Sequence, residues 1–323
     1  MGGLETYTEQ CNGSYVSPYE QAQDYWSWFH IAWPYSVSSY QKEEFNFEVN
    51  FNSEGLRDVD DPLDKPNNEY RIIALGDSYT EGVGAAISET WFNVLEKNMN
   101  NHATDTSFHI NVINGGKSGS DPFFCYVLLK ERLINYQPDM VILAMNTSDV
   151  MDVVVRGGME RFQPDGKIRF KDPPAIEWLF RYSFITRYVM LNIFEYDWYQ
   201  LTPEQQKTEC SRSVDLLISS IQLFEKLARE NRFHFVVVLH PVIDEYNTNE
   251  YSYGFWRIKE NQPPTHLVDM LTYFANSGKI NDDNKFEYFW EIDRHYTPKG
   301  YALFAEGIEK TILEKQLVSL RDH

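Results

Sequence analysis

The chain has 323 residues, 42% of them hydrophobic and 24% charged, a composition that predicts a folded protein with a sizeable core. Its formal net charge of −19 argues against nucleic acid or an anionic membrane surface as a partner, because both would repel it. Three widely spaced cysteines, Cys11, Cys125 and Cys210, match neither a disulfide framework nor a zinc site. No apolar run approaches the roughly 18 residues of a membrane-spanning helix. The first residues, MGGLETYTEQ, lack the basic start and apolar stretch of a signal peptide.

Residues 1–70 differ from the rest of the chain. They are rich in aromatic side chains, above all in YWSWFHIAWPY at 25–35, and they lack long helical periodicity. The segment 45–58 alternates apolar and polar residues as a strand does, and it contains the turn signal Ser-Glu-Gly. We therefore expect an N-terminal extension over residues 1–70 that packs on a core domain of residues 71–323. Its aromatic faces cover the edge of the core or stack on sugar rings.

Strand and helix patterns alternate from residue 71 onward. Strands are predicted at 71–75, 108–114, 139–145 and 233–241, and helices at 89–100, 121–136, 202–232, 265–278 and 299–317. Asp121 before Pro122 marks one helix start, and Thr202 with Gln205 forms the capping box of another. This alternation predicts an α/β fold, with a parallel sheet covered by helices on both faces.

Polar loops that contain glycine or asparagine follow the first three predicted strands. They are GDSYTEG at 76–82, NGGKSGSD at 114–121 and NTSDV at 146–150. Ligands of open α/β sheets bind beyond the carboxyl ends of the strands, so we expect these loops to form one site. The first loop has neither the Gly-Lys-Ser/Thr of a P-loop nor a Gly-x-Gly-x-x-Gly pattern, so the sequence does not predict nucleotide binding.

Ser78 is the candidate nucleophile of this site. A serine at a strand-to-helix turn is held rigidly, and backbone N–H groups of the turn can stabilise an oxyanion. Such a serine needs a base, and the base needs an orienting carboxylate. His295, with Asp293 two residues earlier, supplies both in a loop before the last predicted helix. The alternative is that Ser78 is only a small residue in a tight turn.

Several spaced motifs resemble those of the SGNH hydrolases, also called the GDSL family. They are Gly-Asp-Ser at 76–78, Asn-x-Gly-x-x-Gly at 114–119, and DRHYTPKG at 293–300, which is similar to a bacterial branch with an Asp-x-His last block. NSEGLRD at 52–58 also resembles that branch. The resemblance implies a flavodoxin-like three-layer α/β/α sandwich. It also implies a Ser78–His295–Asp293 triad, oxyanion donors at Ser78 and Gly116, and no cofactor or metal.

The third block departs from the family pattern. Where the family has Gly-x-Asn-Asp, this chain has Asn146-Thr147-Ser148-Asp149, so a serine stands at the position of the oxyanion asparagine. Ser148 could donate through its hydroxyl, or Asn146 could supply an amide from two residues earlier. We expect Asn146, because an amide N–H is a fixed donor and a hydroxyl rotates.

The function expected from these motifs is ester hydrolysis by a serine triad. The substrate would be a small-molecule or carbohydrate ester, with O-acetyl groups on a carbohydrate included. One alternative is an O-acyltransferase, in which a sugar hydroxyl replaces water at the same triad. The other is a non-catalytic binding protein that has kept the fold.

Overall fold

A five-stranded parallel sheet forms the centre of the part of the chain that the computed structural model describes, residues 31–102, 108–170, 174–197, 199–260 and 263–318. Its strands are β3 (Glu69–Leu75), β4 (His109–Asn114), β5 (Met140–Met145), β6 (His234–Leu239) and β7 (Leu267–Asp269). The sequence predicts the first four of these strands, and the structure confirms them. The order across the sheet is β4-β3-β5-β6-β7, which is the flavodoxin-like order.

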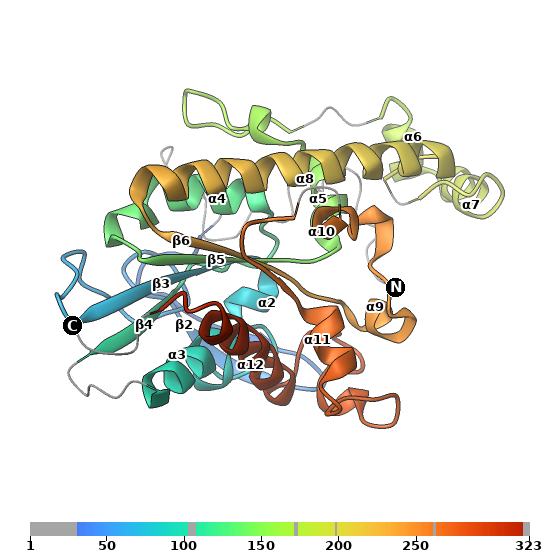
Figure 1. The fold of residues 1–323 in the computed structure, drawn as a ribbon. Coiled ribbons are helices and arrows are strands. Elements are labelled where there is room, and N and C mark those ends of the chain that lie inside the picture. The colour runs from blue at the N-terminus through green and yellow to red at the C-terminus, as the bar shows by residue number, and fades with distance from the viewer. Residues whose placement is uncertain (1–30, 103–107, 171–173, 198, 261–262, 319–323) are drawn as a thin grey trace.

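Helices cover both faces of the sheet (Figure 1). One layer contains α4 (Pro122–Glu131), α5 (Ser148–Arg156) and α8 (Pro203–Asn231); the other contains α3 (Trp91–His102), α11 (Met270–Asn276) and α12 (Pro298–Glu314). In β3, Ile73 and Leu75 pack into the first layer, whereas Ile72 and Ala74 pack into the second. A strand buried on both faces is apolar at successive positions, which explains the unbroken run at 72–75. The predicted three-layer α/β/α sandwich is confirmed.

Side-chain caps fix the start of two of these helices. Asp121 accepts hydrogen bonds from the N–H groups of Phe123 and Phe124, with Pro122 at the first position of α4. The capping box of Thr202 and Gln205 is present at the start of α8. Both caps agree with the sequence prediction.

The helix predicted at 265–278 is wrong in its first part. Residues 267–269 form the edge strand β7, which pairs with β6, and the helix begins only at Met270. Three residues are too few to show the alternation of a strand, and pairing with β6 decides their conformation.

The described residues also form several short helices. They are α2 (Ser78–Glu81), α6 (Glu177–Tyr182), α7 (Phe184–Asn192), α9 (Ile243–Thr248) and α10 (Arg257–Glu260), with single 3₁₀ turns at Ile87–Glu89, Leu133–Tyr136, Met159–Arg161, Ser252–Gly254 and Lys285–Glu287.

An antiparallel hairpin precedes the sheet. Its strands are β1 (Val37–Gln41) and β2 (Asn46–Asn50). The strand predicted within 45–58 is therefore shorter than expected. It stops because the Asn52 side chain accepts hydrogen bonds from the N–H groups of Glu54 and Leu56, which bends the chain into a turn. Residues 1–30, with most of the aromatic stretch at 25–35, lie outside the described residues, so the division at residue 70 stays a prediction.

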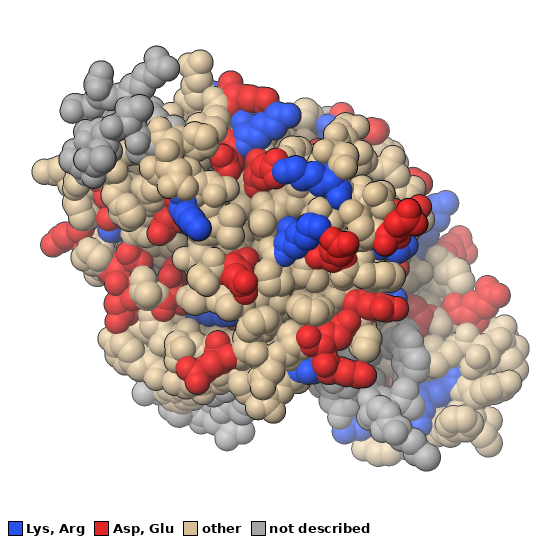
Figure 2. Space-filling model, turned by 90° about the horizontal axis from the view of Figure 1, so that it is seen from below, with Lys and Arg blue, Asp and Glu red and all other residues tan. Residues whose placement is uncertain are grey.

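Acidic and basic side chains are interspersed on the face of the molecule seen in Figure 2. Lysine and arginine side chains stand singly or in small groups among acidic ones there, without a continuous basic area.

Candidate active site

The turn between β3 and α2 places Ser78 at the carboxyl end of the sheet. Gly76 is required here, because a Cβ at this position would lie 2.3 Å from Thr80 Oγ1 and 2.9 Å from the carbonyl oxygen of Ala144. Asp77 caps α2 by accepting a hydrogen bond from the Tyr79 N–H across 2.9 Å. Ser78 is thus the first residue of α2, and the backbone that leads into this helix is fixed by close packing at Gly76 and by the Asp77 cap. Its own N–H has no hydrogen-bond acceptor among the described residues.

His295 lies between Ser78 and Asp293. Its Nε2 is 2.7 Å from Ser78 Oγ, and its Nδ1 is 2.5 Å from Asp293 Oδ1. The Asp293 side chain is 8% exposed and that of His295 is 21% exposed, so the carboxylate is sheltered while the imidazole reaches solvent. The hydrogen bond from His295 lowers the pKa of Asp293, and the charges of His295 and Lys42 lower it further.

The ring of Tyr79 packs against the imidazole of His295. The centres of the Tyr79 and His295 rings are 4.6 Å apart, and the Tyr79 hydroxyl donates to the carbonyl of Arg294 across 3.3 Å. The side chain next to the candidate nucleophile therefore packs against the candidate base. This contact links the first and last motifs of the sequence, which are separated by more than 200 residues.

The loop after β4 lies beside this turn, because the Lys117 N–H donates to the carbonyl of Gly76 across 3.0 Å. The N–H of Gly116, the expected oxyanion donor, is bonded to Asn114 Oδ1 at 2.8 Å. Gly116 is required for close packing instead, since a Cβ there would lie 2.5 Å from the backbone of Thr80 and Glu81. The N–H of Gly119, which has a φ of 76°, lacks an acceptor among the described residues.

The loop after β5 contains Asn146 and Ser148, the two candidates for the third oxyanion donor, and it places their side chains in different environments. Asn146 is fully buried, and its Nδ2 donates to Asp77 Oδ2 at 2.8 Å, so its amide is occupied beneath the turn. Ser148 is exposed, and its Oγ and N–H both donate to Asn146 Oδ1, at 2.7 and 2.8 Å. This geometry does not favour Asn146, the residue expected from the sequence, as a donor to a substrate.

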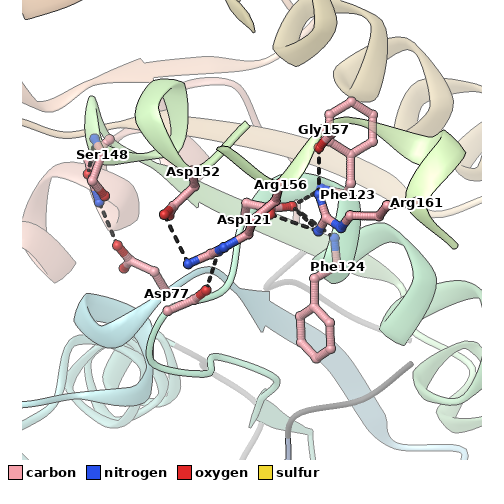
Figure 3. Close-up of polar contacts among 11 residues, drawn as sticks. Asp77, Asp121, Phe123, Phe124, Ser148, Asp152, Arg156, Gly157 and Arg161 are labelled. Carbon is pink, nitrogen blue, oxygen red and sulfur yellow. Dashed lines mark hydrogen bonds and ion pairs between the residues drawn. The ribbon is translucent and has the colours of Figure 1, made fainter. Parts of the chain in front are cut away.

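Charged side chains below the loops hold them in place (Figure 3). Arg156 lies between Asp121 and Asp152, with N–O distances of 3.5 and 3.0 Å, and it donates to the carbonyl of Gly119 at 2.6 Å. Arg161 contacts both oxygens of Asp121, at 2.7 and 2.8 Å. Burial raises the pKa of Asp121, but the charges of Arg161 and Arg156 outweigh it and lower the pKa overall. The loop that contains Gly119 is therefore anchored to an ion-pair network inside the core.

Arg57, from the motif at 52–58, supports the Ser78 turn from the opposite side. Its guanidinium is buried and donates to the carbonyls of Glu81, Gly82 and Ala85, at 3.1, 2.5 and 2.8 Å. Glu81 is the last residue of α2, and Gly82 and Ala85 follow it, so their carbonyls have no partner within the helix and a fork of N–H donors satisfies them. The role of this arginine is a finding of the structure, since the sequence analysis identified the motif at 52–58 without a role for Arg57.

Neither a metal site nor a membrane span is evident in the described ranges. Within residues 31–318, less the short gaps named above, no three or more His, Cys, Asp or Glu side chains are grouped to hold a metal ion. Among those same residues, none of the helices has the length and apolar character needed to cross a membrane.

No protein-family model matches the sequence, and no curated protein matches it. Among solved structures, the chain is similar to the lipase/acylhydrolase from Enterococcus faecalis, at 12% identity and a TM-score of 0.43, over 79% of this chain and 100% of that one. It is similar to a member of the lipolytic protein G-D-S-L family from Veillonella parvula DSM 2008, at 14% identity and a TM-score of 0.41, over 76% of this chain and 97% of that one.

A third similar structure is that of a two-domain esterase active on acetylated mannans. The identity is 15% and the TM-score 0.43, and the match covers 79% of this chain and 52% of that one. These proteins are of the kind that the motifs resemble. At identities and TM-scores this low, however, the likeness decides nothing about the activity of this chain.

Proposed function

We propose that this protein is a serine ester hydrolase of the SGNH type, with Ser78, His295 and Asp293 as its triad. The observation that carries the proposal is the relay of two short contacts, Ser78 Oγ to His295 Nε2 at 2.7 Å and His295 Nδ1 to Asp293 Oδ1 at 2.5 Å. The relay stands at the carboxyl end of a parallel sheet, where open α/β folds bind their ligands. If Ser78 were only a small residue required by the turn, its alignment with a histidine and a carboxylate would be unexplained.

Each residue of the relay has a defined task in this mechanism. Ser78 Oγ attacks the ester carbonyl while its proton passes to His295 Nε2. The tetrahedral intermediate collapses, the alcohol leaves with that proton, and an acyl group remains on Ser78. Water then attacks the acyl group, again losing a proton to His295, and the acid is released as the bond to Ser78 Oγ breaks and His295 returns the proton to that oxygen. Asp293 keeps the Nδ1–H of His295 in place and stabilises the imidazolium.

The oxyanion donors that the geometry supports differ in part from those expected. Among the described residues, the N–H groups of Ser78 and Gly119 have no acceptor and are free to bind an oxyanion, whereas that of Gly116 is held by Asn114. Ser148 is the third donor, since its exposed hydroxyl can turn from Asn146 toward a substrate. Donors aimed at the developing negative charge lower the barrier to acyl transfer.

Labelling with a fluorophosphonate tests the nucleophile. Wild-type protein should be labelled at Ser78, as peptide mass spectrometry would show, and the Ser78→Ala variant should not be labelled and should have lost nearly all p-nitrophenyl acetate hydrolysis. Labelling at another residue, or an Ala variant with more than a few per cent of the activity, would remove Ser78 as the nucleophile. A folded wild type without labelling or hydrolysis would support the non-catalytic alternative.

Analysis of the products formed from acetylated oligosaccharides and from added sugars separates hydrolysis from acyl transfer. Acetyl release from acetylated oligosaccharides would extend the proposal to carbohydrate esters, which stay a prediction. Acetylated product from an added sugar, formed faster than free acetate, would show instead that the triad belongs to an O-acyltransferase.

A further inference from the structure

The β1–β2 hairpin contacts the loop that contains Asp293 and His295. The hairpin turn is closed by a hydrogen bond from the Lys42 N–H to the carbonyl of Phe45, across 2.9 Å. Three of the four residues in this turn, Lys42, Glu44 and Phe45, contact residues 290–293. More than 240 residues separate the two segments in the sequence.

Glu44 makes the principal contact. Its Oε1 accepts a hydrogen bond from the N–H of Glu291 at 2.9 Å, and its Oε2 accepts from Ile292 and Asp293 at 3.0 and 2.8 Å. Successive backbone N–H groups that converge in this way form an anion site, and the carboxylate of Glu44 occupies it. Hydrogen bonds to an ionised acceptor are stronger than neutral ones, so these three contacts hold the loop backbone firmly.

Among the described residues, the N–H groups of residues 291–293 have no acceptor other than Glu44, although Tyr79 and Asp244 contact the neighbouring Arg294. Glu291 and Ile292 are exposed, and the loop is closed on itself by Trp290 N–H to the carbonyl of His295 at 2.8 Å and by Arg294 N–H to that of Trp290 at 3.1 Å. Because Glu44 binds the N–H of Asp293, it fixes the backbone of the residue whose carboxylate orients His295.

Lys42 and Phe45 add to this contact. Lys42 Nζ lies 3.6 Å from Asp293 Oδ2, the oxygen that does not face His295. The Phe45 and Trp290 rings are 5.3 Å apart, and Trp290 Nε1 donates to the carbonyl of Gly84 at 2.9 Å. The Lys42 side chain is 55% exposed, and an exposed ion pair contributes little to stability. Glu44 therefore provides most of the stabilisation of this loop.

We propose that Glu44 is a positioning residue for the triad, which holds the Asp293–His295 loop in its productive geometry. This inference rests on the proposed function for its effect on turnover, but not for its effect on the loop. A displacement of about 1 Å in a catalytic group can cost on the order of a hundredfold in rate. The hairpin, outside the core motifs of the family, would thereby be part of the active site.

The test compares Glu44→Ala and Glu44→Gln with Glu43→Ala. Glu43 is the matched control, since it is an exposed acid in the same turn without a contact to the loop among the described residues. Turnover and Michaelis constant are measured with p-nitrophenyl acetate, and hydrogen exchange is measured at the amides of 291–293. Thermal unfolding shows whether each variant is folded.

We expect Glu44→Ala to lose roughly 10- to 100-fold in kcat with KM within about twofold, and to lose exchange protection at 291–293. Glu44→Gln should lose less, because its amide oxygen still accepts a hydrogen bond but has no charge. Glu43→Ala should match wild type in all three measurements. Glu44→Ala with kcat within twofold of wild type, or a Glu43→Ala variant with an equal loss, would overturn the proposal.

A double-mutant cycle shows whether Glu44 acts through Asp293. In an Asp293→Asn background, Glu44→Ala should cost little further turnover, whereas full additivity would mean that the two residues act independently and would contradict the proposal. Should wild type prove inactive, the serine hydrolase function falls, and exchange at 291–293 still decides the role of Glu44. Unchanged protection in both Glu44→Ala and Glu44→Gln would refute it.

Discussion

The side-chain amide of Asn146 donates a hydrogen bond to Asp77 across 2.8 Å, and both side chains are buried under the turn that carries Ser78. Burial raises the pKa of Asp77, while the hydrogen bonds from the Tyr79 N–H and from Asn146 lower it in part. Asn146 thus stabilises a buried carboxyl group that itself caps α2. Asn146 in that position supports the turn that carries Ser78, while the exposed Ser148 hydroxyl stays the proposed oxyanion donor.

Substitution of Asn146 and Ser148 should therefore give different results. Asn146→Ala should lower the free energy of unfolding by about 1–3 kcal/mol, because Asp77 loses its buried partner. Ser148→Ala should change stability by less than about 0.5 kcal/mol but reduce kcat on the order of tenfold or more, with KM nearly constant. Urea unfolding and steady-state kinetics measure both quantities. If Ser148→Ala keeps full turnover while Asn146→Ala loses only turnover, Asn146 is the donor after all.

Arg57 should prove sensitive even to a change that keeps its charge. Lysine has a single ammonium group and cannot contact the carbonyls of Glu81, Gly82 and Ala85 with the fork geometry of arginine. We expect Arg57→Lys to lower the unfolding free energy by about 1–3 kcal/mol and to reduce kcat through displacement of the Ser78 turn. Arg212→Lys, on the exposed side of α8, is the control. Equal stability and turnover in the two variants would show that the fork is dispensable.

The α/β fold could be predicted from the sequence because β3 to β6 are short, largely apolar runs and the helices α4 and α8 have marked starts, whereas the three residues of β7 were too few to be recognised. Ser78, Asp293 and His295 were predictable because each lies in a spaced motif. The role of Glu44 was not predictable, because its partners are the backbone N–H groups of residues 291–293. Every residue other than proline has such a group, so the sequence does not show which of them binds a side chain. Gly116 and Gly119 could not be told apart for a similar reason, since both are glycines and only the hydrogen bond to Asn114 separates them.

His240 should make the protein less stable in mild acid. It is fully buried, and burial lowers its pKa to about 3, with the nearby His295 charge acting in the same direction. A histidine in the unfolded chain titrates near ~6.5. The unfolded state therefore binds the proton more readily, so the stability is complete above about pH 6.5 and is lost as the pH falls toward 3, by up to about 1.4 kcal/mol per unit.

The measurement is urea unfolding of wild type and His240→Asn between pH 7.5 and 4. The variant should be less stable at pH 7.5, but its stability should fall less steeply with acid. Carboxyls whose pKa is raised by burial, such as the partly buried Asp152 at about 7, act in the opposite direction. Their effect is common to both proteins and cancels in the difference. His109→Asn, at an exposed histidine, should keep the wild-type slope. An unchanged slope in His240→Asn would mean that His240 binds its proton equally well in the folded and unfolded states, which would contradict the prediction.

The pH dependence of turnover tests the pairing of Asp293 with His295. His295 has to be free of its second proton to accept that of Ser78, so kcat/KM should rise with pH and level off once the imidazole is neutral. Asp293 stays ionised throughout, because the hydrogen bond from His295 lowers its pKa. Asp293→Asn removes the negative charge that favours imidazolium, so the midpoint of the profile should move to lower pH. The rate should also fall by roughly a thousandfold or more, since the tautomer is no longer fixed. A small loss with an unchanged midpoint would mean that another carboxylate orients His295, and the 2.5 Å contact between Asp293 and His295 would then have no part in catalysis.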